Sequence, residues 1–173
     1  MIVSAGKQLK VTRRPQSASG KLGHFAAFPL RFVVGFGFIA HGYAKLARGP
    51  EHFITILSAL GVPAPVLMGW LTIGIELVGG LALLIGALVT FVSVPLAAIL
   101  LVAALTVHIR YGFSSIKLQA VTAAGAQFGQ PGYELDLLYL ASLATLVLGG
   151  SGPLAIDDLF RRGKQVRSPG SAL

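Results

Sequence analysis

The sequence predicts an all-α integral membrane protein, a bundle of four transmembrane helices with both termini in the cytoplasm. Hydrophobic residues make up 54% of the chain and charged residues only 12%, whereas about 25% of a typical soluble domain is charged. The mean hydropathy is +0.78, and four apolar stretches approach the ~20 residues that cross a ~30 Å hydrocarbon core. With 173 residues, the chain is long enough for one such bundle.

The first predicted span covers residues 26–46. It follows a polar, basic segment, residues 1–24, that we expect to be a flexible cytoplasmic tail. Arg31 and Lys45 lie near the two ends of the span, where long side chains can reach the membrane surfaces. Residues 47–63 are amphipathic and too few to cross, which predicts a short helix lying on the membrane surface.

The second and third predicted spans, residues 65–85 and 88–108, are separated only by Gly86 and Ala87. Such a short connection requires a tight antiparallel hairpin of helices. Pro95 lies inside the third span, where we expect it to kink the helix.

The fourth predicted span covers residues 133–150. The loop before it, residues 109–131, is rich in Gly, Ser, Ala and Gln and contains no crossing segment. A loop of that length on the end of a bundle often carries function. The bundle domain is therefore expected to cover residues 25–160, followed by a basic cytoplasmic tail at residues 161–173.

The basic residues are divided unequally between the two sides of the predicted bundle. Those on the side of the termini are residues 7, 10, 13, 14, 21, 31, 161, 162, 164 and 167, and those on the opposite side are residues 45, 48, 110 and 117. The positive-inside rule therefore places both termini in the cytoplasm. Basic side chains gathered at the two ends suit contact with anionic lipid headgroups, so nucleic-acid binding is not expected.

Glu76 interrupts the second span and is the most informative ionisable residue in the chain. It lies eleven residues after Pro65, or about 16 Å along a helix, near the middle of the membrane. An ionisable group there costs at least about 2.5 kcal/mol, so it needs a partner or a purpose. We expect Glu76 to handle protons or bind a ligand; the alternative is an acid that only holds helices together.

Other polar side chains are predicted at the outer end of the bundle. His41 and Lys45 are four residues apart and share one face of the first helix, which can point toward Glu76. Three more candidate ligand-binding residues stand where the third helix ends and the fourth begins: His108, Glu134 and Asp136. Together they indicate one shared polar pocket inside the bundle. Alternatively, each is an ordinary residue at a helix end.

The residue types that are absent limit the chemistry. The chain has no cysteine, which excludes disulfides, iron–sulfur clusters and zinc–thiolate sites on this chain. It has four histidines but no C-x-x-C-H motif, and the two histidines at comparable depth lie near the surface, which disfavours both haem and a dedicated metal site. Any redox role must use something bound to the chain.

Taken in order, these residues resemble the DoxX family of small bacterial membrane proteins. The resemblance runs from about Arg31 to Asp157 and is carried by R-x9-H-G-x2-K in the first helix, E-x2-G-G-x-x-L-x-x-G in the second, His108, G-x-E opening the fourth and the ending G-G-S-G-P-x-x-I-D. It implies a four-helix membrane protein associated with redox chemistry. Some relatives are subunits of a thiosulfate:quinone oxidoreductase, and others act in oxidative-stress defence through soluble partner enzymes.

Our leading hypothesis is a redox-associated, multi-pass subunit of the bacterial cytoplasmic (inner) membrane that holds a quinone or another small apolar ligand. Glu76 would exchange protons and Lys45 would supply positive charge. His41 and His108 would hydrogen-bond a carbonyl of the ligand, and a protein partner would supply electrons. Two alternatives are open: a non-enzymatic scaffold for partner proteins, and a small transporter, which would need a continuous polar track. The oligomeric state is left open.

Overall fold

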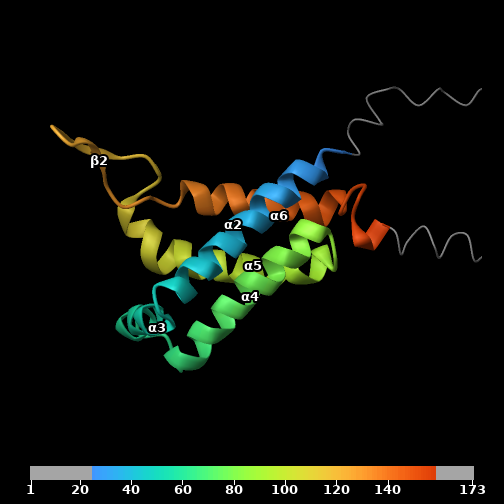
Figure 1. Cartoon of the computed structure of the whole chain (residues 1–173), viewed down its shortest axis with the longest axis horizontal. Coiled ribbons are helices and arrows are strands. Elements are labelled where there is room, and N and C mark those ends of the chain that lie inside the picture. The colour runs from blue at the N-terminus through green and yellow to red at the C-terminus, as the bar shows by residue number, and fades with distance from the viewer. Residues whose placement is uncertain (1–24, 159–173) are drawn as a thin grey trace, which may run out of the picture.

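The computed structural model describes residues 25–158, which form a mostly helical molecule (Figure 1). The elements in chain order are α2 (Ala27–Ala47), α3 (Pro50–Ala59), α4 (Pro65–Ile85), α5 (Val89–Ala103), a π-helical turn (Ala104–His108), a 3-10 turn (Ile109–Tyr111), β1 (Leu118–Thr122), β2 (Gly125–Phe128) and α6 (Glu134–Gly149). Helix α3 and the two strands lie at one end of the molecule, and α2 begins at the opposite end. The tails predicted at residues 1–24 and 161–173 lie outside the described residues.

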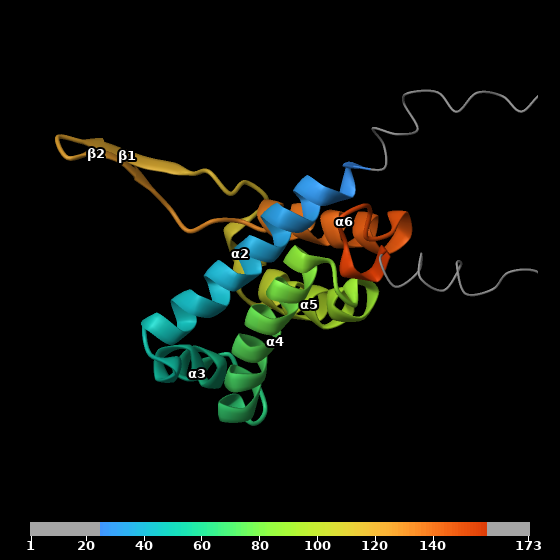
Figure 2. The same cartoon turned by 45° about the vertical axis from the view of Figure 1, so that its right-hand side comes forward.

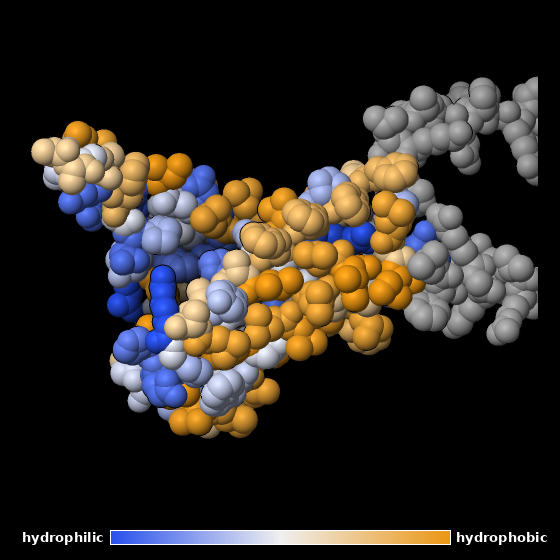
Figure 3. Space-filling view, in the orientation of Figure 1, coloured by the Kyte–Doolittle hydropathy of each residue, from blue (hydrophilic) through white to orange (hydrophobic). Residues whose placement is uncertain are grey.

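Two helical segments in the described part of the chain are long and apolar enough to cross a membrane, Pro65–Ile85 and Val89–Tyr111. Only 33% of the apolar stretch of the first segment and 17% of that of the second are buried inside the molecule. A core helix of a soluble protein would bury most of such a surface. Figure 3 shows apolar side chains over the length of the helices and hydrophilic ones gathered at the end that carries α3. The outer surface of these helices is therefore suited to lipid.

Glycines let α2 and α4 pack with their backbones in contact. A Cβ on Gly35 would lie 2.7 Å from the carbonyl oxygen of Gly80, and a Cβ on Gly80 would lie 2.7 Å from that of Gly35. Small residues serve this purpose at helix crossings in lipid. Around this crossing, α2, α4, α5 and α6 share one core, formed by Val34, Phe38, Leu83, Val89, Leu96, Leu143 and Leu146.

The expectation of an all-α chain is wrong in the loop before α6. Strands β1 and β2 pair antiparallel there, with Leu118 opposite Phe128 and Val121 opposite Ala126. Figure 2 shows this hairpin projecting beyond the helices, and every residue of both strands is exposed. The predicted loop thus contains no crossing segment but does contain a small sheet, which we call the β-hairpin.

The residues that follow α6, 150–158, close the end of the molecule opposite the β-hairpin, and we call them the closing segment. Asp157 accepts hydrogen bonds from the backbone N–H groups of Leu88 at 2.8 Å and Val89 at 3.1 Å, and so caps the start of α5. Arg31 donates to the carbonyl oxygen of Ser151 at 2.5 Å and is 1% exposed. The expectation that Arg31 extends to the membrane surface is therefore wrong, because its guanidinium is bound to carbonyl groups of the closing segment.

Candidate functional site

The first polar pair in the described chain joins α2 to α4. The Nζ of Lys45 lies 2.6 Å from Oε1 and 2.5 Å from Oε2 of Glu76. Glu76 is 4% exposed, whereas the side chain of Lys45 is 21% exposed. A buried carboxylate requires such a partner because an unpaired buried charge is strongly destabilising. We call these two residues the Lys–Glu pair.

Residues around the Lys–Glu pair explain its geometry. Gly42, three residues before Lys45 on α2, allows α4 to come close. A Cβ at Gly42 would lie 3.2 Å from the Cβ of Glu76. The ring of Phe53, from α3, lies 4.9 Å from the Nζ of Lys45, a cation–π distance. Three elements therefore enclose the pair, and the charge of Glu76 is already partnered within the chain.

The second polar pair joins the end of the third helical segment to α6. The Nδ1 of His108 lies 2.6 Å from Oδ2 of Asp136. His108 is the last residue of the π-helical turn, and such turns are frequent at functional sites. Asp136 lies in the first turn of α6, where the helix dipole favours a negative charge. We call these two residues the His–Asp pair.

The His–Asp pair leaves one ring nitrogen of the histidine free. An ionised Asp136 only accepts hydrogen bonds, so Nδ1 of His108 carries the hydrogen of this contact and Nε2 takes no part in it. Within residues 25–158, Nε2 has no hydrogen-bond partner, and the side chain of His108 is 28% exposed while that of Asp136 is 7% exposed. An oriented imidazole with one open nitrogen is the arrangement that acid–base catalysis requires.

Glu134 lies two residues before Asp136 but has a different partner. Its Oε2 accepts a hydrogen bond from the backbone N–H of Ser115 at 2.9 Å. The hydroxyl of Ser115 in turn donates to the carbonyl of Gly132 at 3.3 Å. Glu134 therefore fastens the base of the β-hairpin to α6. The ligand-binding role expected for Glu134 stays a prediction.

Four of the six predicted site residues form two pairs. His41 is exposed on α2 and makes no hydrogen bond or ion pair in the described chain, so the expected contact with Glu76 belongs to Lys45 alone. Among residues 25–158, no hydrogen bond or ion pair joins the Lys–Glu pair to the His–Asp pair. In the same part of the chain, no group of three His, Asp or Glu residues could hold a metal ion.

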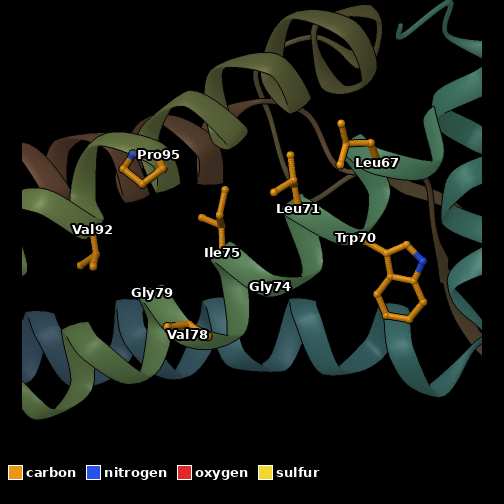
Figure 4. A pocket seen from close by; sticks show the side chains of 9 residues that line it. All are labelled: Leu67, Trp70, Leu71, Gly74, Ile75, Val78, Gly79, Val92 and Pro95. Atoms are coloured by element: carbon orange, nitrogen blue, oxygen red, sulfur yellow. The ribbon is translucent and has the colours of Figure 1, made fainter. Parts of the chain in front are cut away.

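One groove in the described chain is apolar. It has a volume of about 410 Å³ and lies between α4 and α5, with nine lining residues from Leu67 to Pro95 (Figure 4). The only nitrogen or oxygen that the side chains carry there belongs to Trp70. Neither polar pair lines this groove, so it can accept an apolar chain but offers no acid–base group.

Two residues that join distant segments of the chain in the structure had only weak signals in the sequence. Arg31 is a charge five residues inside a predicted span, and that depth could have indicated a buried partner. Tyr139 lies three residues after Asp136, on the same side of α6. Its ring packs edge-on against Phe38 of α2 at 5.6 Å between ring centres.

Comparisons with known proteins identify the family and two relatives of this chain. The model of the DoxX family matches residues 26–109. A curated protein of Bacillus subtilis described as "Putative oxidoreductase CatD" is 32% identical over 136 residues, which cover 79% of this chain and 87% of that protein. An uncharacterized protein of Haemophilus influenzae is 26% identical over 137 residues, which cover 77% and 82% of the two chains. No solved structure matches the chain.

Proposed function

The chain belongs to the DoxX family, and we propose that it is a redox-associated subunit of a bacterial cytoplasmic membrane that binds quinone. In this proposal α2, α4, α5 with its two terminal turns, and α6 each cross the membrane. Both termini lie in the cytoplasm, in keeping with the ten basic residues on their side. The redox role is supported by the similarity to the Bacillus subtilis protein described as "Putative oxidoreductase CatD".

The observation that carries the proposal is the His–Asp pair. Its 2.6 Å contact fixes the ring of His108 and leaves Nε2 open at the end of the bundle that carries α3 and the β-hairpin. That end is the outer one if the termini are cytoplasmic. A quinone carbonyl accepts hydrogen bonds, and a protonated Nε2 can donate one and then release the proton to the reduced oxygen.

The proposed reaction balances electrons and protons. A quinone takes up two electrons and two protons to become a quinol, with one O–H bond formed at each carbonyl oxygen. The two electrons come from the reduced cofactor of a protein partner, which is oxidised. The protons come from the outer aqueous side, and His108 passes them to the ligand one at a time, regaining a proton from water after each transfer.

The Lys–Glu pair has a different place in this proposal from the one the sequence suggested. Because Glu76 is bound by Lys45 at 2.5 Å and buried, its proton-accepting oxygens are occupied. It therefore holds α2 against α4, and the proton role passes to His108. His41, which is exposed, has no part in ligand binding.

The test is quinone retention by the purified full-length protein in mild detergent, measured by mass spectrometry of extracted quinones. We expect wild type to retain quinone, His108→Gln to lose most of it, and His41→Gln to match wild type. His41→Gln is a matched control because it makes the same change on an exposed histidine. A wild-type protein that retains no quinone and binds none when it is added would contradict the proposal.

A second candidate function is supported by the β-hairpin. Leu118, Val121 and Phe128 are 59%, 75% and 60% exposed, and an isolated two-stranded hairpin is marginally stable in water. An apolar surface of this kind is a typical docking site for a protein. If the purified protein recruits a soluble partner but carries no quinone, the chain is a scaffold. A transporter is disfavoured, because the closing segment held by Arg31 and Asp157 blocks one end.

A further inference from the structure

The β-hairpin leaves the bundle at the level where a membrane-spanning segment ends. The apolar segment Val89–Tyr111 ends at the residue before Gly112. Backbone hydrogen bonds then join residues 112–114 to residues 132–134 at the start of α6, among them the bond from the N–H of Tyr133 to the carbonyl of Gly112 at 3.1 Å. In the proposed topology, the base of the β-hairpin is therefore fixed at the outer surface of the membrane.

A β-bulge gives the β-hairpin one apolar face. Leu118 pairs with Phe128 and Val121 pairs with Ala126, so β1 advances three residues while β2 advances two. The extra residue of β1 is the bulge. Paired residues share a face, and successive residues of a regular strand alternate between faces. Phe128 and Ala126 therefore lie on one face together with both of their partners. Without the bulge, Val121 would lie on the face opposite Leu118.

This apolar face is exposed in the part of the chain that the structure describes. Its three large side chains are each at least 59% exposed, whereas the opposite face carries the polar side chains of Thr122 and Gln127. Figures 1 and 2 show the β-hairpin slanting away from the helices to one side. An amphipathic element that starts at the membrane surface is suited to the boundary between lipid headgroups and acyl chains.

The charges of the outer loop favour lipid over other occupants of this face. Residues 109–131 contain two basic residues, Arg110 and Lys117, and no acidic residue. Two copies of the chain that met through this face would bring like charges together, whereas an anionic lipid surface attracts both basic residues. The scaffold alternative places a soluble protein on this face, and that protein would need a surface both apolar and acidic. The bilayer beside the bundle supplies both properties.

We propose that the β-hairpin lies on the outer leaflet of the membrane, with its apolar face inserted at the headgroup boundary and with Arg110 and Lys117 against anionic headgroups. Such elements are buried about 5–10 Å into this boundary. The lipid completes the surroundings of a two-stranded hairpin that is only marginally stable in water. This inference goes beyond the proposed function and does not depend on quinone binding.

The test uses the absence of cysteine from the chain, which allows one nitroxide label to be attached at a single introduced cysteine. Val121→Cys and Ala120→Cys place the label on the apolar face and, as a matched control, on the opposite face of the same exposed strand. The labelled full-length protein is studied in nanodiscs of phosphatidylcholine and phosphatidylglycerol. We expect the label at position 121 to collide more often with oxygen, and less often with a water-soluble nickel chelate, than the label at position 120.

The contribution of charge is tested in the background of the label at position 121. Lys117→Gln removes one basic residue of the β-hairpin, and we expect it to weaken the association with anionic lipid about fivefold. Nanodiscs of phosphatidylcholine alone should weaken the association at least as much. Arg48→Gln is the matched control, because it removes one exposed charge after α2 and should leave the association unchanged.

The outcomes separate this inference from the scaffold alternative and from the proposed function. Equal access of the nickel chelate to positions 120 and 121 would overturn the inference. If the label at position 121 leaves water only after a soluble protein fraction is added, the face belongs to a protein and the lipid assignment is wrong. A protein that retains no quinone, but whose two labels differ as expected, would contradict the proposed function and support this inference.

Discussion

The Lys–Glu pair and the His–Asp pair have nearly the same contact distance and different chemistry. Lys45 and Glu76 meet at 2.5 Å, and His108 and Asp136 meet at 2.6 Å. In the first pair the lysine has a single nitrogen, which lies against both oxygens of the carboxylate. In the second pair the histidine has two ring nitrogens, and the contact uses only Nδ1.

This difference distinguishes the roles that we propose for the two pairs. A lysine bound to both oxygens of a buried glutamate joins α2 to α4, and each of the two groups already has a charged partner. A histidine oriented by an aspartate gains a fixed ring and keeps an open nitrogen. A short contact to a carboxylate is thus no guide to function until the second nitrogen is considered.

The largest expected effect is the loss of turnover in His108→Gln. General acid–base catalysis contributes at least about 100-fold to rate, so we expect the rate of quinone reduction to fall about 100-fold or more. Asp136→Asn should lower it less, because the ring keeps a hydrogen-bonding neighbour but loses the charge that fixes Nδ1–H. The rate is measured in membranes that contain each variant and its partner, by absorbance of the quinone. An unchanged rate in His108→Gln would remove the His–Asp pair from the mechanism.

The next effect concerns stability and falls on the Lys–Glu pair. Glu76→Gln leaves the ammonium of Lys45 without its carboxylate, and we expect about 3 kcal/mol lower free energy of unfolding. The value is at the lower end of the usual range because the side chain of Lys45 is 21% exposed. Denaturant unfolding in detergent measures it. The double variant Lys45→Met, Glu76→Gln should recover part of the loss, since it removes the ammonium that Glu76→Gln alone leaves without a carboxylate.

Equal losses in the single and double variants would show that Glu76 acts without Lys45. A normal stability of Glu76→Gln, combined with lost turnover, would return the proton role to Glu76. The comparison of the two pairs would then be reversed.

The sequence predicted the pairing of Lys45 with Glu76 and missed the orientation of His41 for one physical reason. Spacing of four residues places two side chains on one face of a helix, but it does not say which face meets the neighbouring helix. Gly42 marks that face, because only a glycine lets Glu76 come so close. Lys45 lies three residues after Gly42 and reaches across, whereas His41 lies beside the contact and stays exposed.

The position of α4 was predictable from the sequence, whereas the β-hairpin and the contact of Arg31 with the closing segment were not. Apolar length alone located α4, whose bounds Pro65 and Ile85 are those expected. The β-hairpin was missed because its strands are short and its composition is that of a loop. The contact between Arg31 and Ser151 joins residues 120 positions apart, and no local pattern reports such a pairing.

A smaller effect tests the third element around the Lys–Glu pair. Phe53→Leu keeps an apolar side chain on α3 but removes the aromatic face that lies 4.9 Å from the Nζ of Lys45. We expect a loss of about 0.5–1 kcal/mol in the free energy of unfolding, the usual value of an exposed or half-exposed cation–π contact. The same substitution in the background of Lys45→Met should have a smaller effect. An equal effect in both backgrounds would assign Phe53 to packing alone.

The smallest expected effect is that of His41→Gln, and it sharpens the comparison more than its size suggests. His41 lies six residues before the end of α2 and His108 ends the π-helical turn, and they differ in what each ring contacts. His41 is exposed and has no hydrogen-bond partner in the described chain, whereas His108 is held by Asp136. We expect the unfolding free energy of His41→Gln to stay within about 0.5 kcal/mol of wild type, as for other exposed substitutions. We expect its turnover to match that of wild type. If turnover falls as far as in His108→Gln, then a histidine needs no carboxylate to act in this protein, and the orientation supplied by Asp136 is not the feature that selects His108.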